Sequence, residues 1–171
     1  MCKCEESIEV DNNNNRLIEA RIDHLSIHSR TNNNEQEYKV AISDLLAQNN
    51  FLVVGFERGP YRLHLLHEHN RLLFEIFDEG GFFVCKNYIS IRPFRKVISE
   101  YFVLCESYAD AIKTSAPSEI QLTEVGRRNV HDEGAARLQN CLSEIVKIDQ
   151  STARKLFTLL FLLYSKFPQV P

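Results

Sequence analysis

Arginine and histidine side chains recur in this sequence in a pattern that suits binding an anion or acting on one. Guanidinium groups grip phosphate or carboxylate through paired hydrogen bonds, and imidazole transfers protons near neutral pH. In a helix, residues three and four positions apart share a face, so Arg127 and Arg128 would lie beside His131. If they converge in one cleft, the candidate anion-ligand residues are Arg62, His64, Arg92, Arg95, Arg127, Arg128 and His131.

Parts of this set also have a purely structural interpretation. Glu124, Arg128 and Asp132 follow one another at intervals of four, which is typical of an ion-pair ladder on a helix surface. Arg92 and Arg95 flank a predicted helix start, where free backbone N–H groups attract anions and where cations are mildly unfavourable. The alternative is that Arg95 belongs to the solvated side of an amphipathic helix. Both interpretations stay open at this point.

Neither the histidines nor the cysteines predict a metal or cofactor, so the expectation is none of either. His64 lies in a predicted strand, His67 follows it and His69 belongs to the turn; if the strand continues, its period of two places His64 and His67 on opposite faces. Their spacing matches no zinc signature. Cys2 and Cys4 have no third ligand nearby in the sequence. The tip of this hairpin is expected to be solvated.

Composition argues against several classes of partner. The formal net charge is -3 over 171 residues, so no overall field draws the chain to nucleic acid or acidic lipid. No basic run or aromatic-basic motif is present, and nucleic acid is an improbable ligand. The longest apolar run, residues 156–163, is far shorter than the roughly 20 residues that span a bilayer. With no signal-peptide pattern at the start, the prediction is a cytoplasmic protein without membrane contact.

The first half of the chain alternates between polar turns and short apolar segments. Asparagine stretches at 12–15, 32–34 and 49–50 are typical of a tail, a loop and a helix end. Hydrophobic periodicity predicts a helix over Glu35–Gln48. Strands are expected over Arg16–Ile22, Phe51–Phe56, Tyr61–Leu66, Arg71–Phe77 and Phe82–Ile91. Tight turns between the last four predict an antiparallel meander.

The second half is helical. A long amphipathic helix is predicted from Pro93 through Ile112, and a second begins near Pro117 and is expected to break at Gly126. A helical stripe then runs from 130 to 145 and a short extended link covers 146–148. A last helix is capped by Asp149 or Ser151.

These elements predict an α+β fold. An N-terminal antiparallel β-meander with one helix would pack against a C-terminal group of three to four helices. Residues 1–15 are expected to form a flexible Asn-rich tail, and residues 16–171 a single globular domain. The last helix is apolar nearly all round, so it is either central to the core or part of a subunit interface. The second option predicts a protein partner or a homo-oligomer through the C-terminal helix.

Several blocks of the sequence resemble a known family. They are Gly59–Leu65 (GPYRLHL), Asn70–Ile76 (NRLLFEI), Pro93–Arg95 (PFR), Tyr101-Phe102 (YF), Cys105–Tyr108 (CESY), Gly126–Gly134 (GRRNVHDEG) and Thr152–Leu159 (TARKLFTL). Taken together, from Arg16 to Tyr164, the chain is similar to uncharacterised protein family 0262, known chiefly from alphaproteobacteria. The asparagine insertions, His67 and His69 depart from the family pattern. The resemblance implies no activity, cofactor or catalytic residue.

Two functions remain as hypotheses. Without a recognisable catalytic signature, the sequence favours an uncharacterised protein that is a small non-enzymatic interaction or regulatory domain. The alternative is an anion-binding protein or enzyme, for phosphate or carboxylate ligands, that uses the Arg/His cluster. The alternative depends on the folded positions of those side chains.

Overall fold

The computed structural model describes residues 14–23 and 32–164, with side chains from residue 35 in the second range. The tail predicted over residues 1–15 lies almost wholly outside this part. In chain order the elements are β1 (Leu17–Ile22), α1 (Asn32–Ala47), β2 (Phe51–Val53), β3 (Tyr61–Glu68), β4 (Arg71–Asp78), β5 (Phe83–Ser90), a 3-10 turn (Arg92–Phe94), α2 (Arg95–Thr114), α3 (Pro117–Leu142), β6 (Val146–Ile148) and α4 (Gln150–Tyr164).

The α+β class is confirmed, but the predicted meander is correct only for three of its strands. The main sheet has the order β1-β3-β4-β5, with antiparallel β3–β4 and β4–β5 pairs. β1 pairs with β3 in parallel, which is possible because α1 forms part of the crossover between them. β2 was expected to be the first meander strand. It instead pairs with β6 in a separate two-stranded sheet, and Gly55, with φ of 80°, follows its end.

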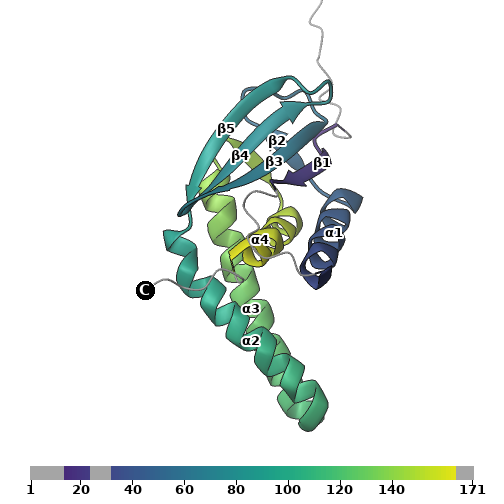
Figure 1. The fold of residues 1–171 in the computed structure, drawn as a ribbon, viewed down its shortest axis with the longest axis vertical. Coiled ribbons are helices and arrows are strands. Elements are labelled where there is room, and N and C mark those ends of the chain that lie inside the picture. Colours follow the sequence, from purple (N-terminus) through teal and green to yellow (C-terminus); the bar gives the residue numbers. More distant parts are fainter. Residues whose placement is uncertain (1–13, 24–31, 165–171) are drawn as a thin grey trace, which may run out of the picture.

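The core lies between one face of the main sheet and the helices (Figure 1). On β3, Tyr61, Leu63 and Leu65 are buried, whereas the residues between them reach the other face. The interpretation of α4 as a central helix is confirmed, because apolar residues around most of its circumference are buried. Burial in the core therefore explains why α4 is so apolar, and no subunit interface is needed to explain it. The apolar sequence of α4 is thus no argument for a partner at this helix. The buried α4 residues are Thr152, Ala153, Leu156, Phe157, Leu159, Leu160 and Leu163.

Two predicted helix boundaries are wrong. α3 runs without a break for 26 residues through Gly126, since a single helical glycine costs only about 1 kcal/mol relative to alanine. α1 begins at Asn32, inside the asparagine stretch that was expected to be a loop.

At α4, Asp149 rather than Ser151 is the cap, because its Oδ1 accepts a hydrogen bond from the Thr152 backbone N–H at 2.8 Å.

The hairpin of α2 and α3 projects well beyond the rest of the domain (Figure 1). We call residues 102–130 the arm. Between the buried side chains of Tyr101 and His131, only Ala111 is buried, and these residues all belong to the described part. The arm therefore contributes little to the core. Across the described residues, the structure contains no helix with the length and apolarity needed to cross a bilayer.

Candidate functional site

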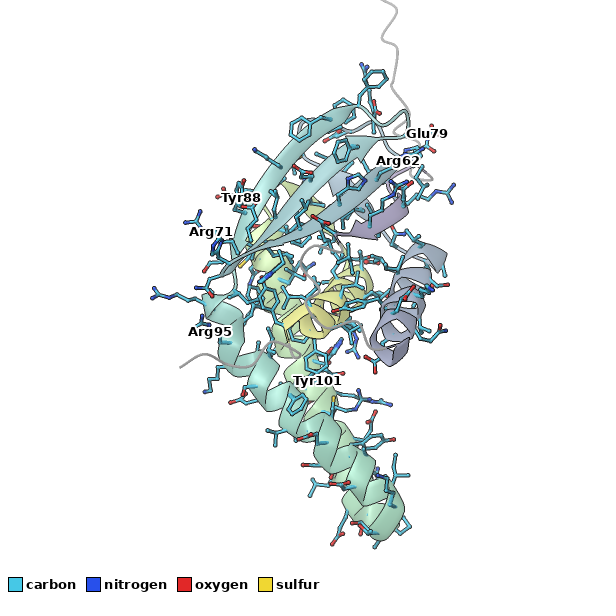
Figure 2. The ribbon with its side chains drawn as sticks, viewed as in Figure 1. Arg62, Arg71, Glu79, Tyr88, Arg95 and Tyr101 are labelled. Carbon is cyan, nitrogen blue, oxygen red and sulfur yellow. The ribbon has the colours of Figure 1, made fainter. Side chains whose placement is uncertain are left out.

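A polar cavity of about 300 Å³ lies where the arm joins the domain, among α1, α2, α3 and α4. Figure 2 shows Tyr101, one of its wall residues, at this junction. We call it the Arg/His cavity. Its lining consists of Asp44, Tyr101, Arg127, Arg128, His131, Ser151, Arg154, Lys155 and Thr158.

The structure brings only three of the seven predicted residues together. Arg127, Arg128 and His131 line the Arg/His cavity, as their helical spacing predicted. The anion-site hypothesis expected several of the seven to converge in one cleft, and these three do so. The other four are Arg62 and His64 on β3 and Arg92 and Arg95 at the start of α2. Figure 2 shows Arg62 and Arg95 at separate places, both away from Tyr101.

Arg62 and His64 lie on the sheet face opposite the core because strand alternation buries Leu63 and Leu65 instead. Arg62 Nη1 lies 2.8 Å from Glu19 Oε2, and its Nε donates to the Glu79 carbonyl at 3.1 Å. These bonds join β3 to β1 and to the β4–β5 turn. Arg62 therefore has a structural role.

Arg95 also makes a structural contact. Its Nη2 donates to Asn70 Oδ1 at 3.0 Å and ties the start of α2 to the β3–β4 turn. Arg92 is exposed in the 3-10 turn before α2. Neither residue lines the Arg/His cavity, so the helix start and the cavity are separate places.

Metal ligands do not gather in the described residues. Across 14–23 and 32–164, no three His, Cys, Asp or Glu side chains form a group that could hold an ion. Cys2 and Cys4 lie outside the described residues. His64 contacts the Phe77 ring at a centroid distance of 4.5 Å, and its Nε2 is 3.8 Å from Glu19 Oε1.

One carboxylate serves two guanidinium groups at the cavity. Glu124 accepts hydrogen bonds from Arg127 Nε and Nη2, both at 2.9 Å, and from Arg128 Nε at 2.7 Å. These bonds, with that of Arg127 first, hold the Glu124 pKa at about 2. The first ion pair of the predicted ladder, between Glu124 and Arg128, is therefore formed. Its second step is not formed, because Asp132 pairs with Arg154 of α4.

His131 is a buried neutral ring. Its side chain is packed against Tyr101 and Phe157, with ring centroids at 5.1 and 5.3 Å. Nε2 lies 3.0 Å from Thr158 Oγ1, and that hydroxyl already donates its hydrogen to the Arg154 carbonyl. With the hydroxyl in that orientation, Nε2 donates to Thr158 Oγ1 and Nδ1 is an acceptor. Nδ1 has no hydrogen-bond partner in the structure.

Burial lowers the pKa of His131 to about 4, and the positive charges of Arg154 and Arg127 add to the effect. At neutral pH the imidazole therefore adds no positive charge to the cavity. It is also a weak base. The idea that His131 acts as an acid or base on a phosphoryl group is disfavoured for this reason.

His131 should make the folded state sensitive to acid. An unfolded histidine takes up its proton at about pH 6.5, well above the folded value, so stability is complete above that pH and falls as pH drops toward 4. The free energy of unfolding should lose about 2 kcal/mol through this group between pH 7 and pH 5. Urea unfolding of the wild type and His131→Gln across this range measures the effect. Equal losses in the two proteins would contradict it.

Several cavity residues lie on elements far from Arg127 in the sequence, so the spacing of residues could not predict that they share a cavity with it. Arg154 and Lys155 belong to α4, and Lys155 Nζ donates to the Gln48 carbonyl at 2.7 Å. The sequence contains one indication of their role, because Arg154 and Lys155 are the only charged residues within α4. Two adjacent cations on an otherwise apolar central helix need a polar environment.

The sequence matches one family model, described as Uncharacterised protein family (UPF0262), over residues 14–166. A UPF0262 protein of Rhodopseudomonas palustris strain TIE-1 is 41% identical over 92% of this chain and 97% of its own length. UPF0262 proteins of Bradyrhizobium diazoefficiens and Nitrobacter winogradskyi are each 40% identical, over 92% and 91% of this chain and 96% and 93% of their own lengths. No solved structure matches the chain.

Proposed function

Since this chain belongs to the uncharacterised protein family UPF0262, whose relatives' names state no activity, we propose a function from its surface: a small non-enzymatic interaction domain whose arm binds a partner protein. The proposal includes a cytoplasmic location. Cys85, Cys105 and Cys141 are free thiols, which suits a reducing compartment.

The observation that supports this proposal is the apolar surface of the arm. Half of the large apolar side chains that are exposed in the described residues lie on it. Leu122 is 74% and Val125 49% exposed, and their spacing of three places them on one face of α3. Contiguous exposed apolar surface marks interaction sites in soluble proteins. The arm residues concerned are Phe102, Val103, Ile112, Leu122 and Val125.

A groove at the base of the arm, lined by the start of α2, the first residues of the arm and Val130 of α3, indicates the kind of partner. It has a volume of about 700 Å³, and its apolar lining residues are Val103, Leu104 and Val130. Lys96 and Glu100, whose charged atoms are 3.7 Å apart, stand at its polar side. An apolar groove beside two packed helices suits the apolar face of an amphipathic helix. The proposed partner is therefore a protein that contributes such a helix.

The test is a comparison of two matched double variants. Val103→Ser/Leu122→Ser removes apolar surface from the groove and from the α3 side of the arm, whereas Val40→Ser/Val54→Ser removes two valines that are exposed elsewhere. Proteins cross-linked to the tagged full chain in its host are identified, purified and titrated against each variant. The arm double should weaken binding by about tenfold or more, because buried apolar anchors dominate interface energy.

Both doubles should unfold within about 1 kcal/mol of the wild type, since the substituted side chains are exposed. The control double should bind like the wild type. If the arm double keeps the wild-type affinity for every partner, or if both doubles lose it equally, the proposal is wrong.

A further inference from the structure

We propose that the Arg/His cavity binds a small phosphate ester that carries hydroxyl groups. The site is separate from the exposed apolar residues of the arm, and the inference does not rest on the proposed partner. It rests on three features of the cavity: uncompensated positive charge, unused hydrogen-bond donors and an acceptor without a partner.

The cavity carries more positive than negative charge. Glu124 is shared by Arg127 and Arg128, so one carboxylate faces two guanidinium groups. Lys155 donates to the neutral carbonyl of Gln48 rather than to a carboxylate. Among the lining residues in the described part of the chain, Asp44 is the one carboxylate. Asp132 also compensates Arg154, so the four cationic side chains and three carboxylates leave a surplus of one positive charge, which favours an anionic ligand.

Donors for a phosphate are available without breaking existing contacts. In the described contacts, Arg128 uses only its Nε, and a guanidinium has five N–H donors. Lys155 uses one of the three donors of its ammonium group. Ser151 adds a hydroxyl in the first turn of α4, where the helix dipole favours an anion. These groups match the forked hydrogen bonding that phosphate oxygens accept.

The hydrogen-bond acceptors in the same cavity favour a ligand that carries hydroxyl groups as well as a phosphate. His131 is 7% exposed, and its Nδ1 is a buried acceptor without a partner. A buried polar atom without a partner is unfavourable, so a ligand hydroxyl that reaches Nδ1 would be stabilised by pairing with it. Asp44 offers a second acceptor. A cavity of about 300 Å³ is at the small end of ligand sites, so a phosphorylated compound of a few carbons fits it.

Calorimetric titration of the full chain with glycerol 3-phosphate and with inorganic phosphate tests this inference. The wild type should bind glycerol 3-phosphate about tenfold more tightly than inorganic phosphate. Arg128→Gln/Lys155→Gln should lower that affinity at least about tenfold. The control, Arg92→Gln/Arg95→Gln, changes the net charge equally outside the cavity and should leave affinity within about twofold.

Absence of binding to the wild type at millimolar ligand would overturn the proposal. Equal losses in the two doubles would do so too, because they would show a general charge effect. Equal affinity for the two ligands would overturn the assignment of a phosphate ester. If the cavity double does not fold, Arg128→Gln alone replaces it, since that side chain is 65% exposed.

Discussion

Gly134→Ala should destabilise the protein by about 3 kcal/mol or more. A Cβ atom at this position would lie 2.3 Å from Phe157 Cζ and 2.4 Å from its Cε2. Phe157 is 0% exposed and Gly134 is buried, so the ring has no free space into which it can move. Overpacking of this kind outweighs the gain of about 1 kcal/mol that alanine brings to a helix interior.

Gly126→Ala is the matched control, because it makes the same change in the same helix. Its new Cβ would meet only Leu104 Cδ2, at an ordinary contact distance of 3.6 Å. The free energy of unfolding should therefore stay constant or rise by up to about 1 kcal/mol. Denaturant unfolding at one pH measures both variants. Destabilisation of both by equal amounts would show that the α3–α4 approach is not the cause.

A second substitution tests the contact itself. Phe157→Leu shortens the side chain that faces Gly134, so it should cost less in the Gly134→Ala background than in the wild type. Additive losses in the double variant would contradict a direct clash.

The two glycines show how far local sequence could predict the packing. Both occur in the Gly126–Gly134 block, and either could have been a kink or a close approach. Helical spacing predicted that Arg127, Arg128 and His131 share a face, which the structure confirms. It could not show that Gly134 meets Phe157, because that contact depends on how α4 packs against α3.

The same limit applies to the fold: pairings between neighbouring segments were predicted, and pairings between distant segments were not. Periodicity predicted the helices and the β3–β4–β5 hairpins, since each depends on residues close together in the chain. The parallel β1–β3 pair and the β2–β6 pair join distant segments, and no local pattern specifies them. The cavity lysine and arginine of α4 were missed for the same reason. Arg62 and His64 were placed in the site because their side chains suit anions, but strand alternation directs them to the opposite sheet face.

The asparagine stretch at 49–50 was predicted to be a helix end, and in the structure Asn49 also connects three segments. Its Oδ1 accepts a hydrogen bond from the Leu17 backbone N–H at 2.7 Å. Its Nδ2 donates to the carbonyls of Leu17 and Leu45 at 3.1 and 3.0 Å. The side-chain amide thus pairs with the start of β1 as a neighbouring strand would, and it also satisfies a carbonyl in the last turn of α1.

Asn49→Ala should lower the free energy of unfolding by about 3 kcal/mol, because three hydrogen bonds at roughly 1 kcal/mol each are lost. Leu17 is buried at 1% exposure, so water cannot easily replace the lost partner of its backbone. Asn50→Ala is the control, because Asn50 donates its backbone N–H to Thr152 Oγ1 and alanine keeps this hydrogen bond. Urea unfolding measures the loss of stability in both variants. Equal losses would mean that Asn49 acts only as a turn residue and that its side-chain hydrogen bonds do not link the segments. Asn49→Asp should be at least as damaging as alanine, since a carboxylate would face the Leu17 and Leu45 carbonyls without a proton to donate.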